Sequence, residues 1–182
     1  MLELSPKLEW VPVLAPEGKA YRYPQDDVKC LRKGYSKPVV YRWVLSGQAP
    51  RSQFLVGETG EFYKRLQAYV GSTARRHVKI REVFDRERAL GGAVGLEILK
   101  FESFALGGVV FAEDRLHCLF VRRVLENVCC ALLSQEGFDL LNDTGEKRAV
   151  RKIARESGLS QEQVLGVIRQ VRSGKTTSTP SH

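Results

Sequence analysis

The chain has 182 residues, of which 43% are hydrophobic, and its 29 Lys and Arg exceed its 21 Asp and Glu, giving a net charge of +8. A chain of this length can form one ordinary domain with a small appendage, and the basic surplus suits a polyanion such as DNA or RNA. No stretch approaches the roughly 20 apolar residues of a membrane span, and the N-terminus lacks the continuous apolar core of a signal peptide. We therefore expect a cytoplasmic protein without membrane contact.

Residues 1–37 are predicted to form a loop-rich arm, because they contain several prolines and mixed charges. One short strand is expected near 10–14. The segments 21–23 and 29–35, with the sequences YRY and KCLRKGY, mix basic and aromatic side chains. Such side chains can contact the backbone and bases of a nucleic acid, or they can pack the arm against the domain. Both interpretations stay open at the level of sequence.

Two strands, at 38–46 and 52–57, are rich in β-branched and aromatic residues and are predicted to pair as a hairpin. A glycine is expected to end the second strand, after which a short turn leads into an amphipathic helix at 60–70. This helix carries Lys64 and Arg65 on one side. A strand, a glycine turn and a helix with an arginine indicate a phosphate site, and the alternative is an ordinary connection with solvated basic residues.

The segment 73–88 is predicted to be mainly helical and exposed, because its apolar positions form only a patchy face. A solvated helix face is the simpler interpretation of its basic residues, and contact with nucleic acid is the alternative. His77 is expected to be a surface residue and not a ligand. The residues that the second interpretation assigns to nucleic acid, together with Lys64, are Arg75, Arg76, Lys79 and Arg81.

The next elements are a third strand at 94–106, the longest helix at 113–135 and a short closing strand at 138–142. The long helix is predicted from apolar residues at helical spacing. With the preceding hairpin and helix, these elements predict an α/β (α+β) fold with a small three-stranded antiparallel sheet flanked by helices. The expected domain spans 38–143.

A basic helix at 146–156 and a second helix at 161–172 follow, with Ser160 as the expected N-cap of the second. Their spacing is similar to that of a helix-turn-helix, and a helical hairpin that caps the domain is the alternative. This unit spans 144–173, and 174–182 is predicted to be a disordered tail. The residues of the unit assigned to nucleic acid are Lys147, Arg148, Arg151 and Lys152.

The four cysteines form no CxxC pair and have no histidine cluster beside them, so the sequence predicts no zinc site. Cys129 and Cys130 lie in an apolar helical run and are expected to be buried and reduced. The sequence also contains no Walker motif, no GxGxxG with a downstream acid and no nucleophile elbow. No second type of chemistry is therefore indicated.

The order of the elements and a set of short motifs resemble the GIY-YIG nuclease family. Val39–Val40–Tyr41 stands where the family has GIY, and Leu55–Val56–Gly57 stands where it has YIG, so Leu55 replaces the second tyrosine. Arg65 stands at the position of the family's helix arginine, and Tyr69 matches a position that is histidine or tyrosine. The resemblance covers more than half of the chain.

Farther along the chain, the resemblance extends to two more residues. Glu126 on the long helix stands where the family has a glutamate, and Asn142 at the end of the closing strand stands where it has an asparagine. A glutamate in an apolar stretch is a signal in itself, because burying an unpaired carboxylate is costly. The alternatives are that Glu126 faces solvent or pairs with Arg122 one helical turn earlier.

The resemblance implies a metal-dependent DNA endonuclease that hydrolyses phosphodiester bonds, with double-stranded DNA as its substrate. It implies that Glu126 holds a divalent metal ion, Mg²⁺ or Mn²⁺, and that Arg65 stabilises the charge on the scissile phosphate. Tyr41 would position or deprotonate the attacking water. Tyr69 would hydrogen-bond in the same cluster, and Asn142 would hold the site together.

Two alternatives to the nuclease remain. The first is a non-catalytic nucleic-acid-binding protein on the same scaffold, because Leu55 removes one hydroxyl from the expected cluster. The second is an unrelated basic α/β interaction module. The second alternative requires no clustering of Tyr41, Arg65, Tyr69, Glu126 and Asn142.

Overall fold

The computed structural model describes residues 8–15, 18–24, 28–31, 34–47, 52–106, 109–141 and 146–173. The first half of the chain contains β1 (Glu9–Pro12), η2 (Val28–Leu31), β2 (Val39–Ser46), β3 (Gln53–Thr59), α1 (Phe62–Gly71) and α2 (Arg75–Ala89). The second half contains β4 (Ala93–Lys100), β5 (Ser103–Leu106), β6 (Val109–Ala112), η3 (Glu113–His117), α3 (Leu119–Gln135), β7 (Asp139–Leu140), α4 (Glu146–Ser157) and α5 (Gln161–Ser173). The predicted tail at 174–182 lies outside the described residues.

A five-stranded sheet in the order β1-β4-β2-β3-β7 forms the centre of the fold. β2 pairs antiparallel with β3 and β4, β1 pairs antiparallel with β4, and β7 pairs parallel with β3. The predicted mixed α/β class is confirmed, but the predicted three-stranded sheet is wrong. The two additional strands have only four and two residues, too few for a side-chain pattern to indicate which strand they pair with.

The predicted third strand, 94–106, is two separate strands. β4 pairs with β1 as far as Lys100, and its pairing with β2 already ends at the Tyr41–Ile98 pair. In the described part of the chain no strand pairs with β4 past Lys100, and the chain leaves the sheet there. β5 then pairs antiparallel with β6 in a small sheet of its own.

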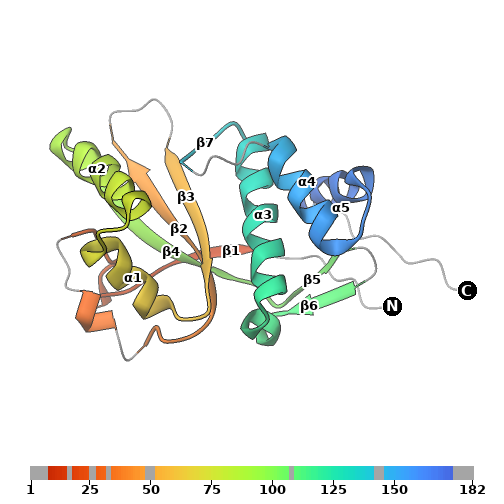
Figure 1. Cartoon of the computed structure of the whole chain (residues 1–182), viewed down its shortest axis with the longest axis horizontal. Helices are drawn as coiled ribbons and strands as arrows, with labels where there is room; N and C mark the ends of the chain where they lie inside the picture. Colours follow the sequence, from red (N-terminus) through yellow and green to blue (C-terminus); the bar gives the residue numbers. More distant parts are fainter. Residues whose placement is uncertain are drawn as a thin grey trace, which may run out of the picture.

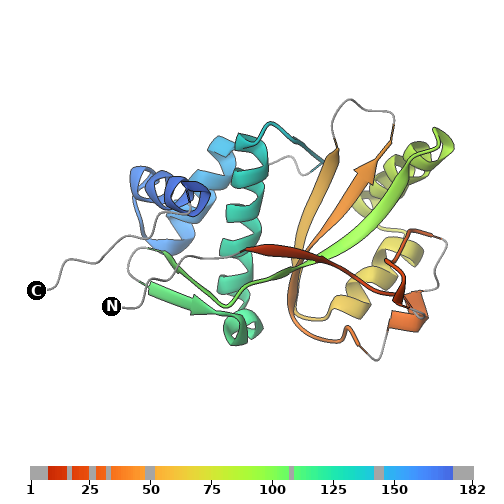
Figure 2. The same ribbon diagram turned by 180° about the vertical axis from the view of Figure 1, so that it is seen from behind.

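Helices cover both faces of the central sheet. Figure 1 shows α1 and α2 on one side and α3 on the other, and Figure 2 shows the same layers from behind. Side chains that alternate along β2 supply both cores, as period-2 geometry requires. Tyr41, Trp43 and Leu45 pack on the side of α1 and α2, whereas Val40 packs on the side of α3.

α4 and α5 extend the core on the α3 side. Val150 and Ile153 of α4 and Val164 and Ile168 of α5 are buried in the same cluster as the apolar face of α3. The C-terminal helical pair therefore shares the hydrophobic core of the preceding domain. Within the described part of the chain, no helix has the length and apolar character that crossing a membrane requires.

The N-terminal arm packs against the sheet through its aromatic residues. Tyr21 and Tyr23 are 1% and 6% exposed, and their rings contact the Trp43 ring with centroid distances of 6.3 and 6.1 Å. These contacts favour the packing interpretation of the YRY segment. Cys129 and Cys130 are buried and free, as expected.

Candidate active site

The two motif segments pair in the sheet with Tyr41 directly opposite Gly57. The prediction that the strand ends at Gly57 is wrong, because β3 continues to Thr59. The glycine meets a different requirement: a Cβ at this position would lie 2.5 Å from both Cζ and the hydroxyl oxygen of Tyr41. The absence of a side chain therefore lets the Tyr41 ring lie against the backbone of β3.

Tyr41 and Tyr69 form a buried hydrogen-bonded pair. Their hydroxyl oxygens are 2.8 Å apart, and the side chains are 1% and 4% exposed. α1 directs Tyr69 toward the sheet because Phe62, Leu66 and Tyr69 share the buried face of this helix. The sequence order thus brings a strand tyrosine and a helix tyrosine into direct contact.

Both tyrosines resist ionisation. Burial raises the pKa of Tyr41 well above its usual value of 10.0, the neighbouring Tyr69 raises it further, and Arg65 opposes the shift. Burial also raises the pKa of Tyr69, and the hydrogen bond from Tyr41 and the charges of Arg65 and Arg76 oppose it. Both phenols are therefore protonated at neutral pH, and the pair acts through hydrogen bonds rather than as a phenolate.

Glu126 lies on α3, which packs on the opposite face of the sheet from α1 and is bonded through Arg122 to Glu58 of β3, near the outer edge of that strand. The register of β7 includes only Gln53 and Phe54 of β3, so in the described chain the rest of this edge has no strand partner. The charge of Glu126 raises the pKa of both Tyr41 and Tyr69, so its carboxylate lies close enough to influence both phenols. α1 and α3 thus contribute to one cluster from opposite faces of the sheet.

An ion pair holds α3 at this edge. Arg122 donates from Nε to the Glu58 carboxylate at 2.8 Å and from Nη1 to the carbonyl oxygens of Leu116 and His117 at 2.6 and 2.9 Å. Arg122 lies one helical turn before Glu126, so both side chains share one face of α3. The alternative that Arg122 pairs with Glu126 is wrong, since the partner of Arg122 is Glu58.

Glu126 is half-buried and has no hydrogen bond or ion pair to any residue that the structure describes. Burial raises its pKa above the usual 4.5, the charge of Lys152 is the largest opposing influence, and Glu58 raises the pKa further. Across the described ranges, no group of three or more His, Cys, Asp and Glu gathers as a metal site. Glu126 therefore offers a single carboxylate with unused oxygen lone pairs.

Arg65 of α1 and Arg76 of α2 supply positive charge to the same place. Each lowers the pKa of Tyr69 and of Glu126, so both guanidinium groups lie near the cluster. Neither has an ion-pair partner among the residues described. Two cations without an ion-pair partner in the described chain, beside a carboxylate and two hydroxyls, form a suitable environment for a phosphate group.

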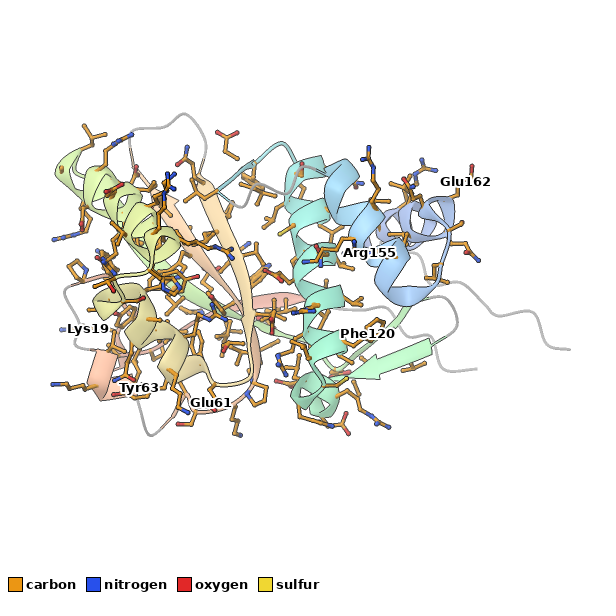
Figure 3. All side chains as sticks on the ribbon, in the orientation of Figure 1. Lys19, Glu61, Tyr63, Phe120, Arg155 and Glu162 are labelled. Carbon is orange, nitrogen blue, oxygen red and sulfur yellow. The ribbon has the colours of Figure 1, made fainter. Side chains whose placement is uncertain are left out.

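Several other basic residues that were predicted to contact nucleic acid lie in different environments. Arg81 donates from Nη1 to the carbonyl oxygens of Tyr69 and Ser72 at 3.0 and 2.8 Å, which ties α2 to the end of α1. Lys64 pairs with Glu61, and both side chains are largely exposed; Figure 3 shows Glu61 beside the first turn of α1. Arg75 and Lys79 are exposed on α2.

The C-terminal unit contributes one residue to the cluster. Lys152 on α4 is half-buried, and its charge lowers the pKa of Glu126 more than any other neighbour does. Arg151 is exposed beside it. The side chains of Lys147 and Arg148, and the whole of Asn142, lie outside the described residues.

Leu55 stands where the family motif has its second tyrosine, and it belongs to the core. It is 2% exposed and lies opposite Trp43 in the pairing of β2 with β3. A leucine here is a packing residue and supplies no hydroxyl to the cluster.

His77 is a site neighbour that the sequence did not indicate. Its ring packs against the Tyr69 ring, with centroids 5.3 Å apart at an angle of 63°. Burial and the charges of Arg65, Arg76 and Arg81 lower its pKa below the usual 6.5. An isolated histidine in a charged helix carries no periodic signal, so only the packing of α2 on α1 reveals its place.

Comparisons of the chain with protein-family models, with curated proteins and with solved structures find no match in any of the three. The geometry of the cluster on β2, α1, α2 and α3 therefore carries the functional inference.

Proposed function

We propose that this chain is a metal-dependent endonuclease of the GIY-YIG type that hydrolyses phosphodiester bonds in double-stranded DNA. The observation that supports it most is the grouping of four side chains that come from a strand and from helices on opposite faces of the sheet. They are the four described residues to which the family resemblance assigns catalysis: Tyr41, Arg65, Tyr69 and Glu126. The cytoplasm, where buried thiols stay reduced, is the proposed compartment.

The charges of the cluster suit phosphodiester hydrolysis. Arg65 would stabilise the negative charge that builds up on the scissile phosphate, and Arg76 would add a second cation at the same phosphate. Lys152 of α4 lies near Glu126 and would contact a neighbouring phosphate. Positive groups from α1, α2 and α4 thus surround the place where the backbone of DNA would lie.

The residues present fit one hard divalent cation. The carboxylate of Glu126 is half-buried and has no protein partner in the described chain, and carboxylate oxygens are preferred ligands of Mg²⁺ and Mn²⁺. Glu58 is engaged by Arg122, so Glu126 would be the protein ligand. When bound, such a cation supplies Lewis-acid stabilisation of phosphate oxygens. With one protein carboxylate, metal affinity should be weak in the absence of DNA.

Tyr41 would orient the attacking water rather than deprotonate it as a phenolate. Its pKa is raised by burial, so its hydroxyl keeps its proton at neutral pH. A protonated phenol can accept a hydrogen bond from water while it remains bonded to Tyr69, which fixes the position of the hydroxyl.

A specific observation favours a second candidate, a nucleic-acid-binding protein on the same scaffold without cleavage. Leu55 places an aliphatic side chain where the family motif has a tyrosine, and the remaining phenol, Tyr41, is buried with a raised pKa. Both features would lower catalytic activity, and neither changes the basic residues that would bind phosphates.

A plasmid nicking assay with Mg²⁺, Mn²⁺ or EDTA tests the proposal. The wild type should nick with either metal and not with EDTA. Glu126→Gln keeps the shape of the side chain and removes its charge, so nicking should collapse while DNA binding persists. Arg65→Ala should cost about 3–4 kcal/mol of transition-state stabilisation, by analogy with the loss of one oxyanion donor. Tyr41→Phe should remove most of the rate, since only a hydroxyl is lost.

Matched controls come from α5. Arg169→Ala and Glu162→Gln change the same residue types at exposed positions, and Figure 3 shows Glu162 on the outer side of the helical layer. Both controls should nick at the wild-type rate. A wild type that nicks while Glu126→Gln nicks equally well would refute the site, and DNA binding without nicking under any metal would favour the second candidate.

A further inference from the structure

His77 is built into the site by two contacts between α1 and α2. Arg81, one helical turn after His77, holds the carbonyl oxygens of Tyr69 and Ser72, which fixes α2 against the end of α1. The His77 ring then packs edge-on against Tyr69, whose hydroxyl bonds to Tyr41. His77 is therefore a fixed neighbour of the tyrosine pair and not a freely rotating surface side chain.

One polar atom of His77 is left without a partner. Its Nδ1 is buried and forms no hydrogen bond with any residue in the described chain. A buried polar atom without a hydrogen bond is unfavourable and uncommon in folded proteins, so the described chain alone does not satisfy the hydrogen-bonding capacity of the His77 ring. The ring as a whole is only half-buried, so a ligand can reach it.

The charges around His77 indicate the sign of that ligand. Arg65 from α1 and Arg76 and Arg81 from α2 lie near the ring, and no carboxylate is among the described groups that shift its pKa. Tyr69, the other titratable neighbour, is neutral. Arg81 is bound to carbonyl oxygens, but Arg65 and Arg76 have no ion pair within the described ranges. The charges around the ring therefore favour an anionic ligand.

We propose that His77, Arg65 and Arg76 form a subsite for a phosphate group of the DNA backbone, and that His77 takes up a proton when this phosphate binds. The inference rests on the nucleic-acid binding of the proposed function and does not require cleavage. The imidazolium donates a hydrogen bond to a phosphate oxygen, and the two arginines contribute charge-assisted bonds. In the free protein the same arginines keep the imidazole neutral.

Proton uptake makes binding dependent on pH. Without DNA, burial and three arginines hold the pKa of His77 below its usual value, so the ring is neutral at pH 7. A bound phosphate opposes the field of the arginines and raises this pKa. A ligand that raises a pKa binds more tightly when the group is protonated, so affinity should increase as pH falls through the His77 pKa of the complex.

Fluorescence anisotropy with a labelled duplex in EDTA, at constant ionic strength from about pH 5.5 to about pH 8, measures this linkage. Wild-type affinity should increase about three- to tenfold toward the acid end, because one linked proton gives at most tenfold per pH unit. His77→Gln should lose most of this increase. The matched control is His117→Gln, at an exposed histidine on η3, which should keep it.

Histidine NMR of the wild type avoids any dependence on variant folding, and the chain has only 3 histidines to assign. The His77 resonance should titrate below pH 6.5 in the free protein and at a higher pH with the duplex bound. An unchanged His77 pKa on saturation with DNA, or a His77→Gln variant with the wild-type pH dependence, would overturn the subsite. Either result leaves the nuclease proposal standing if the wild type still nicks plasmid. A wild type that binds no DNA at any pH would overturn both.

Discussion

At the scale of single residues, the lack of a side chain at Gly57 determines where Tyr41 lies. Gly57 leaves the space that the Tyr41 ring occupies, and this lets the Tyr41 hydroxyl lie against β3, within the influence of Glu126. The same contact explains why the motif glycine lies within a strand, where glycine is normally unfavourable. The glycine is therefore needed for the space that it leaves to the Tyr41 ring, and not for backbone flexibility.

Gly57→Ala should therefore destabilise the fold and displace Tyr41. The added Cβ would lie 2.5 Å from atoms of a fully buried ring, and overpacking of this kind costs about 1–3 kcal/mol. Chemical denaturation should show that loss, and nicking should fall with it. Gly71→Ala, at a helix end where a Cβ meets nothing within 4 Å, is the control and should be neutral or stabilising. Equal stability of Gly57→Ala and wild type would contradict this account of the Tyr41 position.

Glu126→Gln should stabilise the folded protein at neutral pH. Burial raises the folded-state pKa of Glu126, so its charge destabilises the fold fully above that pKa and not at all below the unfolded value near 4.5. The melting temperature of the variant should exceed that of the wild type at pH 7, by about 2–4 °C for each kcal/mol released, and the difference should vanish toward pH 4. Glu82→Gln, exposed on α2, is the control without such an effect. A variant less stable than wild type at pH 7 would argue against a strained carboxylate.

The sequence predicts some of these residues and not others. Tyr41, Arg65 and Tyr69 were predicted as site residues from their match to the motifs of the family that the sequence resembles, and the structure brings Tyr41 and Tyr69 into contact. The proximity of Lys152 to Glu126 could not, because it depends on how α4 packs on α3. His77 depends likewise on the packing of α2 against α1.

At the scale of elements, the position of α3 decides whether Glu126 can reach the site. Glu58 on β3 and Arg122 on α3 have side chains that are only 14% and 8% exposed, and their bond joins the two elements next to Gly57. Breaking a buried pair by removing one partner leaves an uncompensated charge. The pair therefore fixes α3 and its carboxylate against the edge of β3.

Arg122→Met should cost about 3–5 kcal/mol in unfolding free energy, because Glu58 would remain buried without its partner. It should also lower metal-dependent nicking below the level that the stability loss explains. Lys100→Met is the comparison, since its pair with Glu113 is about half exposed and worth about 0–1 kcal/mol. Similar losses from both substitutions would show that the pair does not fix α3.

The elements themselves were easier to predict than their arrangement. Helices near α1, α2, α3, α4 and α5 follow from periodicity, and most of their observed bounds lie within two residues of the predicted ones. The exception is α3, which begins at Leu119 and not at 113, because Glu113–His117 forms the separate 3-10 helix η3. The order of the strands in the sheet could not be predicted from periodicity, because β1 and β7 are short and pair with distant segments. The sheet is therefore wider than the sequence indicates.

At the scale of the whole molecule, the basic residues behind the net charge of +8 lie in two kinds of environment. Basic residues from α1, α2 and α4 surround Glu126, whereas others form exposed pairs such as Lys64 with Glu61. Figure 1 shows that these helices flank the sheet from both sides, so a polyanion at the site would contact both layers.

DNA binding should therefore be strongly salt-dependent. Each neutralised phosphate adds about −0.9 to the slope of log K against log salt. Arg76→Ala should make the slope shallower by about one unit, whereas Arg169→Ala on α5 should leave it unchanged. Anisotropy titrations at several salt concentrations give both slopes. Binding that is absent at low salt or insensitive to salt would contradict the DNA partner.

The most direct test of the central claim is a crystal structure of the protein with a short duplex and Mn²⁺, measured at the manganese absorption edge. The account predicts one anomalous peak coordinated by the Glu126 carboxylate, with a phosphate between that ion and the Arg65 guanidinium. Glu126→Gln in the same crystals should lose the peak and keep the DNA. A duplex bound elsewhere on the molecule, or manganese bound with no contact to Glu126, would contradict the proposed active site.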